Sequence, residues 1–155
     1  MAVIIFAALA AAIFALDWFL KNYIEKHLQV GEEKPVCQGR LLIRRYHNKG
    51  AFLDAGEKRQ KAVALLSLLL SLFMTVVFLG TFSFRGNAAL KAGLALLLGG
   101  AYSNTYDRLT RNYVVDYVSF PVKNKRIRRI VFNISDFCII IGALLMVLGE
   151  GKIRR

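Results

Sequence analysis

Residues 62–84 read AVALLSLLLSLFMTVVFLGTFSF, a run of 23 residues without a charged side chain. About 20 helical residues cross a hydrocarbon core of about 30 Å, so this stretch is long and apolar enough to span a membrane. Three further stretches have similar length and composition, namely 2–20, 88–106 and 130–149. The sequence therefore predicts an all-α integral membrane protein with four transmembrane helices.

Composition supports the membrane class and limits the possible partners. The chain has 155 residues, of which 56% are hydrophobic, and this length suits a single membrane domain covering residues 1–155. Its 22 Lys and Arg residues exceed the 10 acidic ones, for a net charge of +12. Because the basic residues cluster between the apolar stretches, we expect membrane phospholipids as partners and no nucleic acid. Cys37 and Cys138 are isolated, which predicts neither a disulfide nor a metal site.

Four spans would place both ends of the chain on one side of the membrane. The polar ends of three spans, Asp116 and the segment 22–61 would then all lie on the opposite side. Within that segment, GRLLIRRYHNKGAF (39–52) alternates weakly and contains turn residues, whereas Gly31 and Pro35 oppose one continuous helix. The sequence therefore predicts a small β-rich cradle between the first two helices.

Two aspartates occupy positions that are costly in a membrane protein. Asp136 lies within the apolar stretch 130–149, and Asp116 lies in NYVVDYVSF (112–120). A carboxylate at membrane depth indicates a functional site by default. A structural role for Asp136 would require a buried cationic partner, and residues 62–84 supply none. Counted from the start of its stretch, a helix would place Asp136 about 9 Å along its axis.

Two neighbouring carboxyl groups suit the hydrolysis of a peptide bond. Like charges a few ångströms apart cannot both ionise, so Asp116 and Asp136 would share one proton. The ionised member can deprotonate a water molecule, and the protonated member can donate to the carbonyl oxygen of the scissile amide. No Ser–His or Cys–His arrangement competes at this face.

Helical spacing adds polar candidates around the aspartates. Asn133 lies three residues before Asp136 and shares its helix face, and Asn104, Asp107 and Arg108 share a face of the third span. Asp107 and Arg108 also fit a helix-end pair, and Asn104 also fits a hydrogen bond to a neighbouring helix.

The first span and the β-rich segment contribute four more residues. Asp17 and Lys21 lie four apart, which favours a structural ion pair at the membrane interface. Asn48 and Gly50 fit either a turn or a part of the site.

These residues together resemble a known family, the type II (prolipoprotein) signal peptidases. The motifs that carry the resemblance are, in chain order, DWFLK with Asp17 and Lys21, HNKGAF with Asn48, Gly50 and Phe52, GGAYSNTYDRLTRNYVVDYVSF with Asn104, Asp107, Arg108 and Asp116, and FNISD with Asn133 and Asp136. Each motif is weak alone, but four of them in order at matching span ends form a specific pattern.

The resemblance implies four membrane helices and a small extracytoplasmic β-cradle in the bacterial cytoplasmic membrane. It implies a monomeric aspartic endopeptidase, without metal or organic cofactor, that removes signal peptides from diacylglyceryl-modified prolipoproteins. Asp116 and Asp136 would be the catalytic dyad. The residues expected to bind substrate or support the dyad are Asn48, Gly50, Asn104, Arg108 and Asn133.

The chain departs from the family pattern at three places. Ser103 stands where a glycine is usual, and Ser135-Asp136-Phe137 stands where Ala-Asp-Ser is usual. The loop KNKRIRR (123–129) is unusually basic. These departures predict a changed substrate preference or a divergent paralogue.

The expected orientation conflicts with the positive-inside tendency. With both ends cytoplasmic, five basic residues lie inside and the other 17 lie outside. We keep the family orientation, because segment 22–61 is expected to fold as a unit and its basic surface can hold anionic phospholipid.

Two other functions fit parts of the pattern. A non-catalytic membrane protein that binds lipid or lipopeptide would keep the cleft without needing both carboxylates. A proton-coupled transporter would use Asp136 as its proton site, but it would need polar residues in both halves of the bundle, and here they lie at one end.

Overall fold

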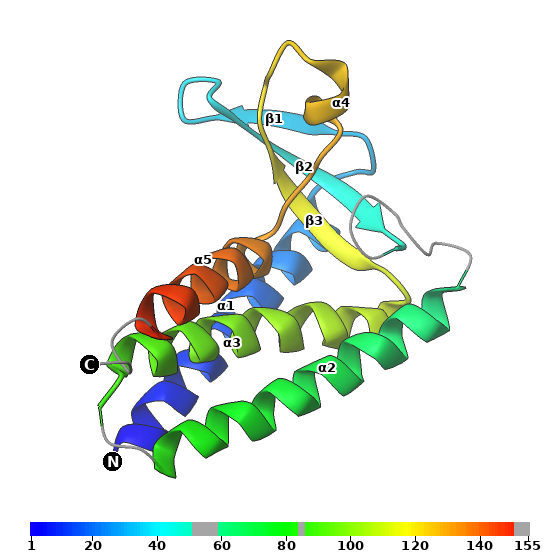
Figure 1. Cartoon of the computed structure of the whole chain (residues 1–155). Coiled ribbons are helices and arrows are strands. Elements are labelled where there is room, and N and C mark those ends of the chain that lie inside the picture. The colour runs from blue at the N-terminus through cyan, green and yellow to red at the C-terminus, as the bar shows by residue number, and fades with distance from the viewer. Residues whose placement is uncertain (51–58, 84–85, 151–155) are drawn as a thin grey trace.

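The computed structural model describes residues 1–50, 59–83 and 86–150. Its long helices are α1 (Ala2–His27), α2 (Gln60–Gly80), α3 (Ala88–Arg111) and α5 (Ile134–Glu150), with short helices η3 (Thr81–Ser83) and α4 (Lys125–Arg128). Helix α3 lies centrally and packs against α1, α2 and α5 (Figure 1). The sheet lies at one end of this bundle, beyond the last turns of α1 and α3.

Among the residues that the structure describes, two segments are long and apolar enough to cross a membrane, α1 and the run Gln60–Ser83. Helix α5 is apolar but shorter, and α3 carries the buried polar side chains of the bundle. Both α1 and α2 turn large apolar side chains outward, as Ile4 (71% exposed) and Val76 (70% exposed) show. Their outer faces therefore lack the polar cover of a water-soluble bundle.

The sheet contains three antiparallel strands in the order β1 (Glu33–Val36), β2 (Leu41–Asn48) and β3 (Val114–Ser119). Strands β1 and β2 lie in the segment predicted to be β-rich. That segment does not hold the whole sheet, because β3 comes from the connection between α3 and α5. In the register of β2 and β3, Tyr46 pairs with Asp116, so the first predicted aspartate lies on a strand.

Helix α1 continues to His27, beyond the expected span end at residue 20. The added turns pack Ile24 and Leu28 against Val115 and Tyr117 of β3 in a small apolar core. This core attaches the sheet to the helical bundle.

Helix α5 begins at Ile134, four residues later than the predicted span. The preceding Phe132 pairs with β3 instead, since its backbone N–H donates to Val118 O at 2.7 Å and its carbonyl accepts from Val118 N at 2.7 Å. Asp136 consequently lies in the first turn of α5. The predicted depth of Asp136 along the helix is therefore wrong.

Candidate active site

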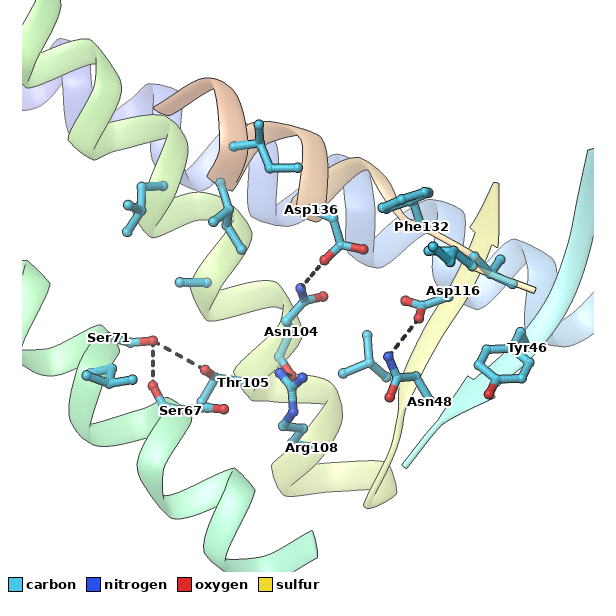
Figure 2. A pocket seen from close by; sticks show the side chains of 18 of the residues that line it. Tyr46, Asn48, Ser67, Ser71, Asn104, Thr105, Arg108, Asp116, Phe132 and Asp136 are labelled. Atoms are coloured by element: carbon cyan, nitrogen blue, oxygen red, sulfur yellow. Dashed lines mark hydrogen bonds between the residues drawn. The ribbon is translucent and has the colours of Figure 1, made fainter. Parts of the chain in front are cut away.

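Asp116 and Asp136 line one cavity of about 890 Å³ at the junction of sheet and bundle (Figure 2). Strand β3 carries Asp116, which is only 2% exposed, and α5 carries Asp136. The structure therefore brings together the two aspartates that the sequence singled out, which lie 20 residues apart in the chain.

Three asparagines hold the two carboxyl groups. Asp116 accepts from Asn48 Nδ2 at 3.1 Å and from Asn133 Nδ2 at 2.7 Å, one at each oxygen. Asp136 accepts from Asn104 Nδ2 at 3.0 Å and from the backbone N–H of Asn133 at 3.0 Å. Each of the four carboxyl oxygens thus has one fixed donor and keeps room for a shared proton or a water molecule.

Asn133 and Asp136 also form the start of α5. The backbone N–H of Asp136 donates to Asn133 Oδ1 at 2.9 Å, while the backbone N–H of Asn133 donates to the Asp136 carboxylate. This reciprocal pattern is a capping box, which satisfies otherwise free N–H groups of a helix end. The same two side chains therefore begin the helix and build the site.

Asn48 is held in a similar way at the end of β2. The backbone N–H of Gly50 donates to Asn48 Oδ1 at 3.1 Å, which turns the amide NH₂ toward Asp116. Asn48 and Gly50 were expected either to form a turn or to belong to the site, and this arrangement does both. Phe52, from the same motif, lies outside the described residues.

Burial dominates the electrostatics of the strand carboxyl. It raises the pKa of Asp116 to about 8, with a further contribution from the negative charge of Asp136 and partial opposition from the hydrogen bonds of Asn48 and Asn133. Asp116 is therefore protonated at neutral pH, in the same cavity as the second carboxyl group, Asp136. One acid and one carboxylate in a common cavity can perform general acid–base chemistry.

Arg108 extends from α3 into the same cavity (Figure 2). Its guanidinium donates to the backbone carbonyls of Asn104 at 3.3 Å and Gly50 at 3.4 Å. Its Nε is buried and has no hydrogen-bond partner within the described parts of the chain. The side chain thus brings a positive charge and donor capacity beside the two aspartates.

The predicted Asp17–Lys21 pair is present, with 2.8 Å between Lys21 Nζ and Asp17 Oδ2. Asp17 is 0% and Lys21 1% exposed, so the pair is buried within the protein, and its expected position at the membrane interface stays a prediction. Asp107 completes this cluster at 3.2 Å from Lys21 Nζ and pairs with Arg111 at 3.3 Å. Within the described residues, these two are the ion-pair partners of Asp107, so the Asp107–Arg108 helix-end pair is not formed.

Sequence reasoning missed three hydroxyl groups around Asp17. Its carboxylate accepts from Ser103 Oγ at 2.7 Å, from Ser135 Oγ at 2.5 Å and from Tyr117 OH at 2.8 Å. Ser103 and Ser135 are two of the departures from the family pattern, and these departures were the sequence feature that could have indicated the contacts to Asp17. Tyr117 gave no signal beyond following Asp116 directly.

The remaining departures lie at the edge of the site. The ring of Phe137 packs against Phe132, a cavity-lining residue, with 5.5 Å between centroids. In the basic loop, Arg128 lies 3.3 Å from Glu33 of β1, and Arg129 lines the cavity.

A family model described as signal peptidase (SPase) II matches residues 9–150. The lipoprotein signal peptidase of Mesorhizobium japonicum is 31% identical over 147 residues, covering 94% of this chain and 84% of the relative. That of Geobacillus thermodenitrificans is 32% identical over 151 residues, covering 92% and 87%.

Solved structures of bacterial membrane enzymes share the fold. One superposes with a TM-score of 0.78 at 21% identity, over 94% of this chain and 86% of that chain. Another gives 0.73 at 20% identity, over 92% and 90%. The chain is thus a mostly helical membrane protein with a small antiparallel sheet. Since the family model covers nearly its whole length, the chain belongs to the signal peptidase II family.

Proposed function

We propose that the chain removes signal peptides from diacylglyceryl-modified prolipoproteins as an aspartic endopeptidase. Its family supports this reaction, because the relatives in Mesorhizobium japonicum and Geobacillus thermodenitrificans are lipoprotein signal peptidases. The single observation that supports the chemistry is the pair of carboxyl groups, Asp116 and Asp136, in one cavity with a fixed donor on every oxygen.

In the proposed mechanism, ionised Asp136 takes a proton from water while Asp116 donates its proton to the carbonyl oxygen of the scissile amide. The water oxygen bonds to the carbonyl carbon and gives a tetrahedral intermediate, without a covalent enzyme intermediate. The intermediate collapses when the proton on Asp136 passes to the departing nitrogen and the C–N bond breaks. Asp116 then recovers a proton from the hydroxyl of the intermediate, and the dyad returns to one shared proton.

Supporting roles follow from the contacts. Asn48, Asn104 and Asn133 keep the two carboxyls in place, and Gly50 orients Asn48. Arg108 has an unused buried donor and a positive charge, which suit a substrate backbone carbonyl or the developing oxyanion.

The cavity wall suits a lipid-bearing substrate. Its lining includes apolar side chains, namely Leu70 and Met74 from α2, Leu97 from α3, and Ile139 and Ile140 from α5, beside the hydroxyl groups of Ser67, Ser71 and Thr105. Acyl chains and an apolar signal segment can occupy such a surface, while the cleaved bond lies at the polar end.

We further propose a single domain, residues 1–155, with four membrane spans formed by α1, α2 with η3, α3 and α5. Phospholipid would contact the exposed apolar faces of α1, α2 and α5, such as Val147 at 71% exposure. The active site would face the extracytoplasmic side of the bacterial cytoplasmic membrane, and the protein would act as a monomer.

The test is cleavage of a diacylglyceryl prolipopeptide by purified Asp116→Asn and Asp136→Asn variants. Each removes one partner of the proton exchange, so kcat should fall at least about 10³-fold while the lipopeptide still binds. Glu32→Gln is the control, since it neutralises a carboxylate of the sheet edge outside the cavity.

Wild-type turnover in either Asn variant would exclude the dyad. A wild-type protein that binds the lipopeptide without cleaving it would favour the non-catalytic lipopeptide-binding alternative.

A further inference from the structure

Lys21 is a fully buried cation with more acceptors than protons. Its ammonium group lies 2.8 Å from Asp17 Oδ2, 2.8 Å from Asn104 Oδ1, 3.1 Å from Ser103 Oγ and 3.2 Å from Asp107 Oδ2. Two carboxylates would suffice to compensate the charge of a lysine. Charge compensation therefore explains neither the contact to Ser103, whose hydroxyl also donates to Asp17, nor the contact to Asn104.

The contact from Lys21 to Asn104 Oδ1, together with a longer one of 3.2 Å from Asn133 Nδ2 to the same oxygen, fixes which way the Asn104 amide points. An ammonium group only donates, so the amide atom beside Lys21 is the oxygen, and the NH₂ group faces Asp136 Oδ1 at 3.0 Å. The reversed amide would place its oxygen against the Asp136 carboxylate and its NH₂ against the ammonium. Both contacts would be repulsive.

Backbone groups help to orient the other two asparagines. Asn48 is oriented by the backbone N–H of Gly50, and Asn133 by the backbone N–H of Asp136. For Asn104, the donor nearest to the amide oxygen is the charged side chain of Lys21, at 2.8 Å.

We propose that Lys21 is a positioning residue of the active site, which holds the Asn104 amide so that its NH₂ group binds Asp136. This inference rests on the proposed function. Lys21 acts on the dyad through Asn104 and, being 1% exposed, does not touch the substrate.

Asp17 supports the same arrangement, because it binds the two helices that carry Asn104 and Asp136. It accepts from Ser103 and Ser135, which directly precede Asn104 in α3 and Asp136 in α5. The Asp17–Lys21 pair thus holds the α3 backbone beside Asn104 and the α5 backbone beside Asp136. The two serine departures serve one buried carboxylate, so they belong to a single local arrangement.

The double variant Asp17→Asn, Lys21→Met separates positioning from charge compensation. It removes one negative and one positive buried charge together, so it avoids an uncompensated charge and should melt near the wild-type temperature. Without Lys21 the Asn104 oxygen keeps only the donor Asn133 Nδ2 at 3.2 Å, so the amide can reverse more easily. We expect kcat for prolipopeptide cleavage to fall about 10- to 100-fold with KM nearly unchanged. The acidic limb of the kcat–pH profile should move to higher pH, because a reversed amide accepts from a protonated carboxyl.

Lys91→Met is the matched control. It removes the other buried lysine of the described chain, which is 7% exposed and lies at the opposite end of α3. It should lower the melting temperature without changing kcat or the pH profile.

A double variant that folds and cleaves at the wild-type rate would overturn the proposal, as would a loss of kcat that also occurs in Lys91→Met. If the double variant does not fold, Lys21→Arg decides, since a guanidinium also only donates. Retention of most kcat by folded Lys21→Arg supports the proposal, and its loss overturns it. Failure of the proposed function itself would be seen separately, as a wild-type protein without cleavage.

Discussion

At the residue scale, the site depends on donors that fix each carboxyl oxygen before substrate arrives. Asn133 has the central position, since its side chain bonds Asp116 while its backbone N–H bonds Asp136. Two buried carboxylates that are both ionised would cost free energy through desolvation and mutual repulsion, and a shared proton lowers that cost. The raised pKa of Asp116 is therefore a consequence of the geometry that makes the pair useful.

The pKa of Asp116, about 8, predicts the alkaline limit of activity. Below that pH Asp116 can protonate the scissile carbonyl oxygen, and above it both carboxyls are ionised. We expect kcat to fall about tenfold per pH unit above pH 8, measured from pH 5 to 10 in detergent. A rate that stays constant to pH 10 would contradict the assignment of Asp116 as the acid.

The same shift predicts how stability depends on pH. The usual pKa of Asp116 is 3.8, so between pH 3.8 and about 8 the folded state holds a proton that the unfolded state has lost. Stability contributed by this group therefore decreases as pH rises through that window. Asp116→Asn lacks the titration, so its melting temperature should exceed that of wild type at pH 9, with a smaller difference at pH 5.

At the scale of elements, the distance between α3 and α5 determines where Asp136 lies. Glycines allow this close approach: a Cβ on Gly100 would lie 2.5 Å from Ser135 O, and one on Gly142 would lie 2.5 Å from Gly93 O. Because Ser135 precedes Asp136, the first of these contacts lies directly beneath the site.

Gly100→Ala should therefore displace the start of α5 and damage both stability and catalysis. The added Cβ meets backbone, which cannot move without the helix, so we expect a loss of about 1–3 kcal/mol and a fall in kcat. Gly80→Ala is the control, because nothing lies within 4 Å of its Cβ position. Thermal unfolding and turnover measured on both variants provide the check, and equal effects would contradict the close-packing argument.

Sequence patterns predicted the helices better than their ends. Hydropathy identified the apolar runs because membrane spans are long and uninterrupted, but it does not separate helix from strand. Phe132 was therefore predicted to be part of the fourth span, although it forms a bridge with Val118 of β3 and lies before the start of α5. Strand β3 was missed because its pairing with β2 joins residues about 70 positions apart, which local patterns do not encode.

The candidate site was predicted more fully than the sheet that carries part of it. Asp116, Asp136 and the three asparagines lie in or beside motifs at span ends, so topology alone placed them at one face. The buried contacts of Lys21 and Asp17 were not predictable, because helical spacing gives a shared face but does not say what covers that face.

At the scale of the whole molecule, the polar groups lie at one end, and the proposed orientation would place most basic residues outside, against the positive-inside tendency. The sheet end carries the basic strands and loop, and the opposite end holds the start of α1 and the end of α2 (Figure 1). Some of these basic side chains are paired, such as Arg45 with Glu25 at 2.6 Å and Arg44 with Glu33 at 3.1 Å. Each such pair lowers the free positive charge of the cradle, so the count of basic residues overstates the conflict with the proposed orientation.

Native cysteines allow this orientation to be measured. Cys37 is exposed in the turn between β1 and β2, and in a Cys138→Ser background a membrane-impermeant maleimide should label it in intact spheroplasts of an expressing bacterium. Ser83→Cys, in a chain without both native cysteines, reports the opposite end, because Ser83 is exposed in η3. It should react only after the membrane is permeabilised. The reverse pattern would place the basic cradle in the cytoplasm, in agreement with the positive-inside tendency, and would separate the active site from a substrate cleaved on the outer side.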